Sequence, residues 1–146
     1  MTALFVCGKE VKDQMHHYEI SKEYAALAEE VLDEHEDLHW ISQVGISIGF
    51  VEADWEKINA TGEVLGDCRL VKGPYHIFCP FDFLITIYTP NVAHLTEEQK
   101  KILLYHELLH VDMSEKNGEP VYRTAPHDVQ DFRKVIDQYG VRWAGD

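Results

Sequence analysis

Apolar residues recur at intervals of three or four positions after Ser21, which predicts an amphipathic helix with Ser21 as its N-cap. The positions between them are mostly acidic and suit a solvent-facing side. The predicted buried face consists of Tyr24, Ala28, Val31, His35 and Leu38. Residues 40–51 are rich in Ile, Val and Phe, so we expect a strand there.

The strongest strand signal in the chain lies at residues 83–88, where β-branched and aromatic residues follow one another and Pro90 ends the run. A second, shorter strand is predicted at 67–72, before Gly73-Pro74. Residues 55–61 fit either a short helix or a loop.

A long helix is predicted to begin after Thr96, because Thr96 and Gln99 have the spacing of a capping box. We expect it to continue to about residue 113. Its apolar residues cover much of its circumference, which indicates a central, buried helix. These residues are Ile102, Leu103, Leu108, Leu109 and Val111.

The C-terminal part reads as a loop followed by a last helix. Asn117-Gly118, Pro120 and Pro126 predict that residues 114–126 form the loop. The helix is expected to begin near His127 or Asp128 and to end at Gly140. Its apolar stripe consists of Val129, Phe132, Val135, Ile136 and Tyr139.

Composition is consistent with one globular domain over residues 1–146, in which the first 20 residues show no clear element. The chain has no apolar run long enough to span a bilayer and no secretory leader pattern, so we expect a cytoplasmic protein without a membrane partner. Its net charge is −13, from 26 acidic and 13 basic residues. Such a surface repels phosphate groups, so direct binding to nucleic acid is not expected.

The three cysteines, Cys7, Cys68 and Cys79, are an odd number without a C-x-x-C spacing. This argues against a disulfide framework and against a zinc ribbon. We expect reduced thiols that pack as small apolar side chains. A pairing of Cys68 with Cys79 across neighbouring strands remains open.

The pattern H-E-x-x-H occurs twice, at residues 35–39 and at residues 106–110. Histidines four positions apart lie one turn above each other on a helix and can bind one zinc ion, and the intervening glutamate can act as general base. A chain with this many histidines and glutamates contains a chance match in roughly one case in twenty. One copy alone therefore carries little weight.

Context favours the second copy. His35 and His39 lie where the first helix is predicted to end, whereas His106, Glu107 and His110 lie in a capped apolar helix that follows a strong strand. Polar groups in a buried helix need partners, and a metal ion supplies one. We therefore expect zinc at His106 and His110.

A catalytic zinc site has three protein ligands and an open position. His127 is the expected third ligand, because it follows a loop and opens the last helix. The oxygen-donor alternatives are Asp128, Glu119, Glu115 and Asp131. Asp128 and Asp131 can instead orient a ligand imidazole.

The run Tyr105-His106-Glu107-Leu108-Leu109-His110, followed by Pro126-His127-Asp128-Val129-Gln130-Asp131-Phe132 and by Tyr139-Gly140, resembles the putative phage metallopeptidase family. That family is related to the SprT-like and minigluzincin zincins. The strand at 82–87 resembles the strand that precedes the active helix in that family. The helix-to-strand junction at 37–41 resembles the family's N-terminal junction.

The resemblance implies a small α+β zincin-like domain, with a three- to four-stranded, mostly antiparallel sheet packed on the H-E-x-x-H helix and its neighbours. It implies that His106, His110 and His127 hold Zn²⁺, that Glu107 is the general base, and that a peptide or protein is the substrate. The DNA-binding region of SprT-like proteases has no counterpart in a basic patch or zinc ribbon of this chain.

The same residues are compatible with other functions. Tyr122 or Arg123 can stabilise an oxyanion, ahead of Tyr105 and Tyr139, which fit apolar stripes. The rival classes are a zincin-fold binding or regulatory module, a structural zinc closed by Asp128 or Glu119, and a metal-dependent hydrolase of another bond. No substrate, oligomeric state or role for His16, His17, His35 and His39 is assigned.

Overall fold

The computed structural model describes residues 17–127, 132–140 and 142–144. A four-stranded sheet forms one layer, with the strand order β1 (Tyr18–Ile20), β2 (Ile48–Ala53), β6 (Phe83–Tyr88) and β5 (Gly66–Leu70). The outer pairs β1–β2 and β5–β6 are antiparallel, and the central pair β2–β6 is parallel. β5 therefore forms one edge of the sheet.

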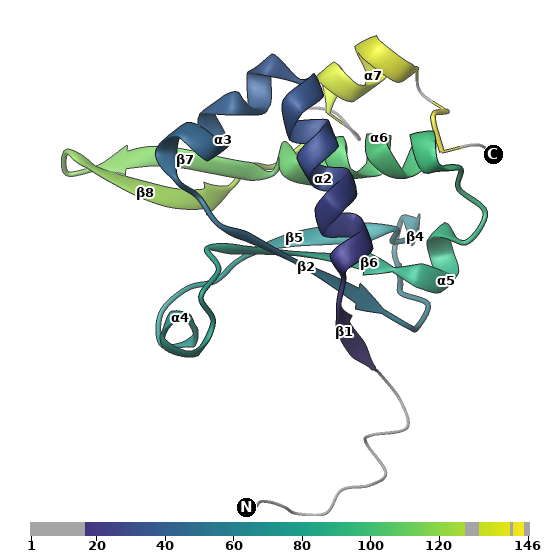
Figure 1. The fold of residues 1–146 in the computed structure, drawn as a ribbon, viewed down its shortest axis with the longest axis horizontal. Coiled ribbons are helices and arrows are strands. Elements are labelled where there is room, and N and C mark those ends of the chain that lie inside the picture. The colour runs from purple at the N-terminus through teal and green to yellow at the C-terminus, as the bar shows by residue number, and fades with distance from the viewer. Residues whose placement is uncertain (1–16, 128–131, 141, 145–146) are drawn as a thin grey trace, which may run out of the picture.

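Two helices, α2 (Lys22–Glu34) and α6 (Glu97–Leu108), pack against each other and lie on one face of this sheet (Figure 1). Alternate residues of β6, namely Phe83, Ile85 and Ile87, are fully buried in the same core as both helices. The remaining elements connect or flank this core. They are the 3₁₀ helix η2 (Glu36–Leu38), α3 (His39–Val44), β3 (Ile58–Asn59), β4 (Gly62–Glu63), α4 (Tyr75–Phe78), α5 (Thr89–Val92), β7 (Val111–Lys116), β8 (Glu119–Thr124) and α7 (Arg133–Tyr139).

Several predicted boundaries are confirmed, and the class is mixed α and β as expected. The Ser21 hydroxyl accepts a hydrogen bond from the Tyr24 amide at the start of α2. Both halves of the capping box between Thr96 and Gln99 are formed. The strand predicted at 83–88 is β6, and α7 ends at Gly140 as predicted.

The strand predicted at 40–51 is wrong in its first half, which forms α3. The amide of Gly45 bonds to the carbonyls of Ile41 and Ser42 while its φ is 89°, so Gly45 ends this helix in the left-handed region. β2 then begins at Ile48. Ile41 is buried in the core, but it belongs to a helix rather than to a strand. The prediction failed because a short apolar run does not distinguish a buried helix from a buried strand.

The predicted loop at 114–126 is instead largely the antiparallel hairpin β7–β8, and α6 stops at Leu108 rather than near residue 113. Asn117 and Gly118 form the turn with φ values of 55° and 80°, which is the type I′ geometry that two-residue hairpins favour. The hairpin is mostly exposed and polar, so it lacked the apolar alternation by which strands are recognised.

Two further elements differ from expectation. Residues 55–61 contribute to the small hairpin β3–β4, rather than forming a short helix or an open loop. α7 begins at Arg133 instead of near His127, and the intervening residues 128–131 lie outside the described residues.

Cys68 and Cys79 are free thiols, so the pairing left open for them does not form, and Cys7 lies outside the described residues. Within the part of the chain that the structure describes, no helix has both the length and the apolar character required to cross a bilayer.

A polar cluster connects α7 to the core. The Tyr105 hydroxyl donates to Asp37 Oδ2 at 2.9 Å and accepts from Gln138 Nε2 at 2.8 Å. Lys134 Nζ donates to the same Asp37 oxygen at 3.1 Å, and the ring of His35 stacks on Tyr105 with 3.9 Å between centroids. Three segments far apart in the sequence thus meet around the residue that precedes His106.

The charge of Asp37 is stabilised by these contacts. Partial burial alone would raise the pKa of this carboxyl, but the hydrogen bonds from Tyr105 and Lys134 outweigh burial, so the pKa lies below its usual value. A carboxyl with a lowered pKa stabilises the folded state above its unfolded-state pKa, and this contribution disappears as the pH falls through the folded-state pKa.

We predict that Asp37→Asn lowers the free energy of unfolding at pH 7 by about 1 kcal/mol, since the Asp37 side chain remains partly exposed. The difference from the unmodified protein should shrink below about pH 4, where the carboxyl takes up a proton. Urea denaturation at several pH values measures both quantities. Asp33→Asn is the matched control, because its carboxylate makes no ion pair among the described residues; an equal loss there would remove the role given to the cluster.

Candidate metal centre

The last turn of α6 carries the first half of the site. His106 and Glu107 belong to the helix, Leu109 is its C-cap, and His110 follows. The sequence predicted that the whole motif lies within the helix. In the structure the motif instead extends past the end of the helix. The His110 amide still bonds to the Glu107 carbonyl at 3.1 Å, so the turn continues and the rings of His106 and His110 remain 5.3 Å apart between centroids.

The hairpin β7–β8 brings in the third histidine. Its second strand returns to the end of α6, where the Ala125 amide donates to the His110 carbonyl at 2.7 Å. The Ala125 carbonyl in turn accepts from His110 Nδ1 at 2.6 Å. These two contacts hold the chain against α6, and His127 follows two residues later with its ring directed at the same point.

The three imidazoles converge. His127 Nε2 lies 3.0 Å from His106 Nε2 and 3.0 Å from His110 Nε2. Two nitrogens bound to one tetrahedral zinc ion at roughly 2.0–2.1 Å lie roughly 3.3 Å apart, which is close to these separations. Within the described ranges, these histidines are the one group of metal-ligating side chains whose donor atoms can share an ion.

Protonation supports a cation at this point. Because the Ala125 carbonyl is only an acceptor, His110 carries its proton on Nδ1, and in the neutral ring Nε2 presents a lone pair to its neighbours. His127 Nε2 can donate one proton to only one of its two neighbouring nitrogens at a time. A cation among the three nitrogens satisfies all of them, and the partial negative charge at the C-terminal end of α6 attracts it.

Phe132 forms an apolar support for the three rings. Its ring is buried and lies 5.4, 4.9 and 5.2 Å from the centroids of His106, His110 and His127, respectively. The sequence placed Phe132 only in the apolar stripe of the last helix. Its contact with all three imidazoles limits their rotation, which helps to hold the nitrogens at one point.

Glu107 lies beside the histidines and is 3% exposed. A cavity of about 410 Å³ is lined by this residue, the three histidines and strand β5, among others. Gly66 of β5 lies close to the carboxylate: a β-carbon at Gly66 would be 3.5 Å from Glu107 Oε2 and 2.9 Å from the Thr86 carbonyl oxygen. The first distance is an ordinary contact, but the second is too short for a β-carbon, so the approach of Gly66 to the Thr86 carbonyl requires glycine.

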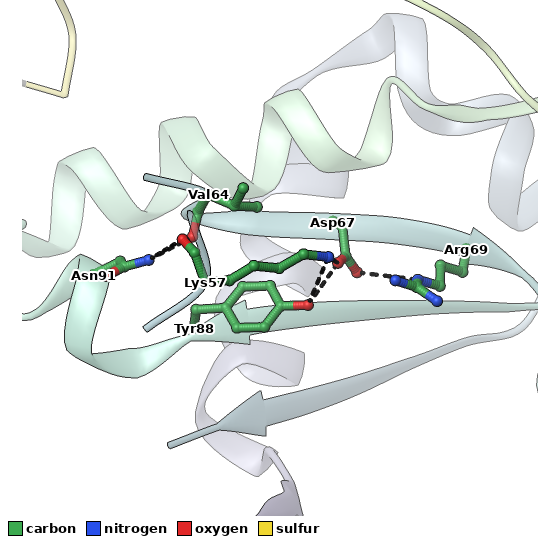
Figure 2. A network of polar contacts seen from close by, with 6 residues as sticks. All are labelled: Lys57, Val64, Asp67, Arg69, Tyr88 and Asn91. Atoms are coloured by element: carbon green, nitrogen blue, oxygen red, sulfur yellow. Dashed lines mark hydrogen bonds and ion pairs between the residues drawn. The ribbon is translucent and has the colours of Figure 1, made fainter. Parts of the chain in front are cut away.

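The wall of the cavity opposite α6 is held by a second polar network (Figure 2). The Tyr88 hydroxyl and Lys57 Nζ both donate to Asp67 Oδ2, at 2.7 and 3.2 Å. Asn91, which is buried, donates to the Lys57 carbonyl at 3.0 Å and to the Val64 carbonyl at 2.8 Å. Asn91 thereby fastens both ends of the β3–β4 hairpin, which borders the cavity.

Two pKa shifts accompany this wall. Burial, followed by the carboxylates of Glu107 and Asp67, raises the pKa of the Cys68 thiol well above its usual value. Burial and the hydrogen bond to Asp67 raise the pKa of Tyr88 in the same way, so its phenol keeps the proton that it donates. Both groups are neutral near pH 7.

The other H-E-x-x-H copy does not form a comparable centre. α2 ends at Glu34, so His35 is its C-cap and His39 begins α3. His35 Nε2 contacts the Tyr139 hydroxyl at 3.2 Å, while His39 Nε2 contacts the Asp33 carbonyl at 3.1 Å. The break in the helix turns the two rings to different partners.

The structure does not bring the alternative metal ligands or the candidate oxyanion-stabilising residues that it describes into the group of three histidines. Glu115 and Glu119 lie near the exposed far end of the hairpin, and Asp128 and Asp131 lie outside the described residues. The remaining candidates have other contacts: Tyr122 packs on Phe83, Arg123 pairs with Asp112, Tyr105 donates to Asp37, and Tyr139 contacts His35. No sequence signal had pointed to Ala125 or Gly66, because one acts through its backbone and the other through the absence of a side chain.

One family model matches the chain. The model of a family described as putative phage metallopeptidase matches residues 16–145, which include the three histidines and Glu107. No curated protein and no solved structure gives a match. The family description implies a bound metal and peptide or protein substrates. The resemblance noted in residues 105–140 is thus confirmed over almost the whole length, and the chain belongs to the putative phage metallopeptidase family.

Proposed function

We propose that the chain is a zinc-dependent peptidase of the zincin type. His106, His110 and His127 hold the zinc ion, and Glu107 is the general base. The observation that carries this proposal is the convergence of three imidazole Nε2 atoms in a cavity that Glu107 also lines.

The donor set favours zinc. Three neutral imidazoles suit zinc better than calcium or magnesium, which prefer oxygen ligands. The structural-zinc alternative requires a fourth protein ligand, and Glu119, one candidate, lies at the far end of the hairpin opposite Lys116. A cavity of about 410 Å³ next to three ligands instead leaves room for water and substrate, which supports catalysis over a closed structural site.

A zinc ion at this position would supply Lewis acidity, which lowers the pKa of a water molecule and polarises a carbonyl group. Glu107 receives the proton that water loses as its oxygen attacks the peptide carbonyl carbon. Glu107 then delivers this proton to the amide nitrogen as the carbon–nitrogen bond breaks, so the products are a carboxylic acid and an amine. The position of Glu107 in the lining of the cavity, next to the three histidines, supports this role.

Strand β5 is suited to align the substrate. It is an edge strand of the main sheet, and it lines the cavity from Gly66 to Cys68. An extended peptide can add to such an edge through main-chain hydrogen bonds, which are independent of side-chain identity. A peptide aligned in this way would pass between β5 and the histidines.

We predict that the unmodified protein binds one zinc ion per chain and that the double variant His106→Ala/His110→Ala binds none, because only one imidazole remains. His127→Ala should weaken binding by at least about tenfold, since one of three ligands is lost. Calorimetric titration with zinc and metal analysis of the purified protein measure this. His39→Ala, from the other H-E-x-x-H copy, should retain the metal; stoichiometric zinc in the double variant would contradict the site.

We predict that Glu107→Gln lowers the rate of cleavage of denatured casein at least about 100-fold, because the amide cannot accept the proton. Zinc content should remain equal to that of the unmodified protein, and a chelator should abolish the activity of both. Glu36→Gln, which changes the glutamate of the other copy, should cleave normally. Undiminished cleavage by Glu107→Gln would remove the general base from the proposal.

A further inference from the structure

A second cleft continues the cavity of the metal centre along the edge strand. It has a volume of about 630 Å³, and Cys68 lines both hollows, so they adjoin at this residue. One side is the C-terminal half of β5 and the other is the end of β8. The lining residues are Cys68, Arg69, Leu70, Lys72, Arg123 and Thr124.

The charge of this cleft is opposite to that of the whole chain. Three of its six lining residues are basic and none is acidic, in a protein with 13 basic and 26 acidic residues. The adjoining cavity, by contrast, contains the carboxylates of Glu63, Asp67 and Glu107. The path along β5 therefore passes from an acidic, metal-binding end to a basic end.

The cations of the cleft keep hydrogen-bond donors for a ligand. Arg123 uses its Nε to pair with Asp112 at 2.6 Å, and its guanidinium carries further N–H groups on the two Nη atoms. Arg69 Nε lies 3.9 Å from Asp67 Oδ1, and the Arg69 side chain is 70% exposed, so this pair is weak. Lys72 is exposed. Guanidinium groups of this kind favour carboxylates, which they bind through two parallel hydrogen bonds.

The geometry of β5 sets the distance from the reacting bond. Gly66 lies beside Glu107 and Leu70 lines the basic cleft. β8 lies close to β5 at the cleft, so a peptide can pair only with the half of β5 next to the metal centre and then continue into the cleft. At roughly 3.3 Å per residue, it reaches the cleft about two to four residues away from the bond at the metal centre. Side chains at these positions would meet the guanidinium and ammonium groups.

We propose that Arg69, Lys72 and Arg123 form a specificity subsite that selects peptides with aspartate or glutamate two to four residues to one side of the cleaved bond. This inference rests on the proposed peptidase function and names its substrate class. Nucleic acid fits the cleft less well. Three cations are few for a phosphate backbone, and the net charge of −13 repels a long polyanion beyond the cleft.

The binding test uses the full-length, zinc-loaded Glu107→Gln variant, which leaves the peptides uncleaved. Its probes are fluorescently labelled octapeptides in which alanine alternates with glutamate, glutamine or lysine, so that a shift of at most one residue places test side chains in the cleft. Fluorescence anisotropy should show the glutamate peptide binding about tenfold more tightly than the glutamine peptide at low salt, and the lysine peptide binding least. The preference should largely disappear at 1 M salt, where charges are screened.

The matched variants are Arg69→Gln/Lys72→Gln/Arg123→Gln and the control Lys22→Gln, both added to Glu107→Gln. Lys22 lies at the start of α2 and lines neither hollow. The triple substitution should abolish the glutamate preference while zinc content and the circular dichroism spectrum stay unchanged, and Lys22→Gln should keep the preference. All three residues of the triple variant are exposed, so folding should be retained.

Three outcomes would overturn the subsite: equal binding of the glutamate and glutamine peptides, a glutamate preference that survives the triple substitution, or tighter binding of an oligothymidine octamer than of the glutamate peptide. Failure of the unmodified protein to cleave casein, with the glutamate preference intact, would instead contradict the proposed peptidase and leave an acidic-peptide binding site. The two failures are therefore distinguishable.

Discussion

The candidate metal centre depends on two hydrogen bonds between His110 and Ala125. One joins the backbone amide of Ala125 to the His110 carbonyl, and the other joins His110 Nδ1 to the Ala125 carbonyl. Together they attach the end of β8 to the end of α6, place His127 within 3.0 Å of the other two nitrogens, and put the His110 lone pair on Nε2. This attachment helps to fix the third imidazole relative to the first two, since the hairpin that carries it is otherwise largely exposed.

Around this attachment, each wall of the cavity at the candidate site is supported by contacts from a different part of the chain. Phe132 supports the three imidazoles from one side. On the other side, Asn91 fastens the β3–β4 hairpin, and Gly66 lies next to Glu107 while it allows β5 to approach the Thr86 carbonyl. The same edge strand then continues into the basic cleft. The proposed chemistry and the proposed selectivity therefore share one strand, whose two ends lie in regions of opposite charge.

The two H-E-x-x-H copies show how the same residue pattern takes different roles in different contexts. In residues 35–39 the helix ends at the first histidine, and the side chains bond to nearby carbonyl and hydroxyl groups. In residues 106–110 the turn closes through the Glu107 carbonyl, so both rings face one cavity. The first copy nevertheless supports the second, since His35 and Asp37 both contact Tyr105, the residue before His106.

The sequence by itself determined the local features: the caps at Ser21 and Thr96, the strand at 83–88, and the selection of His106, His110 and His127, whose donor atoms converge. These follow from side-chain chemistry and spacing within one turn or one strand. Tertiary structure alone decided that the β7–β8 hairpin returns to the end of α6, that Ala125 orients His110, and that Gly66 lies against Glu107. The physical reason is that these features use backbone groups, or the lack of a side chain, to join segments distant in sequence. Such contacts leave no periodic signal in the order of the residues.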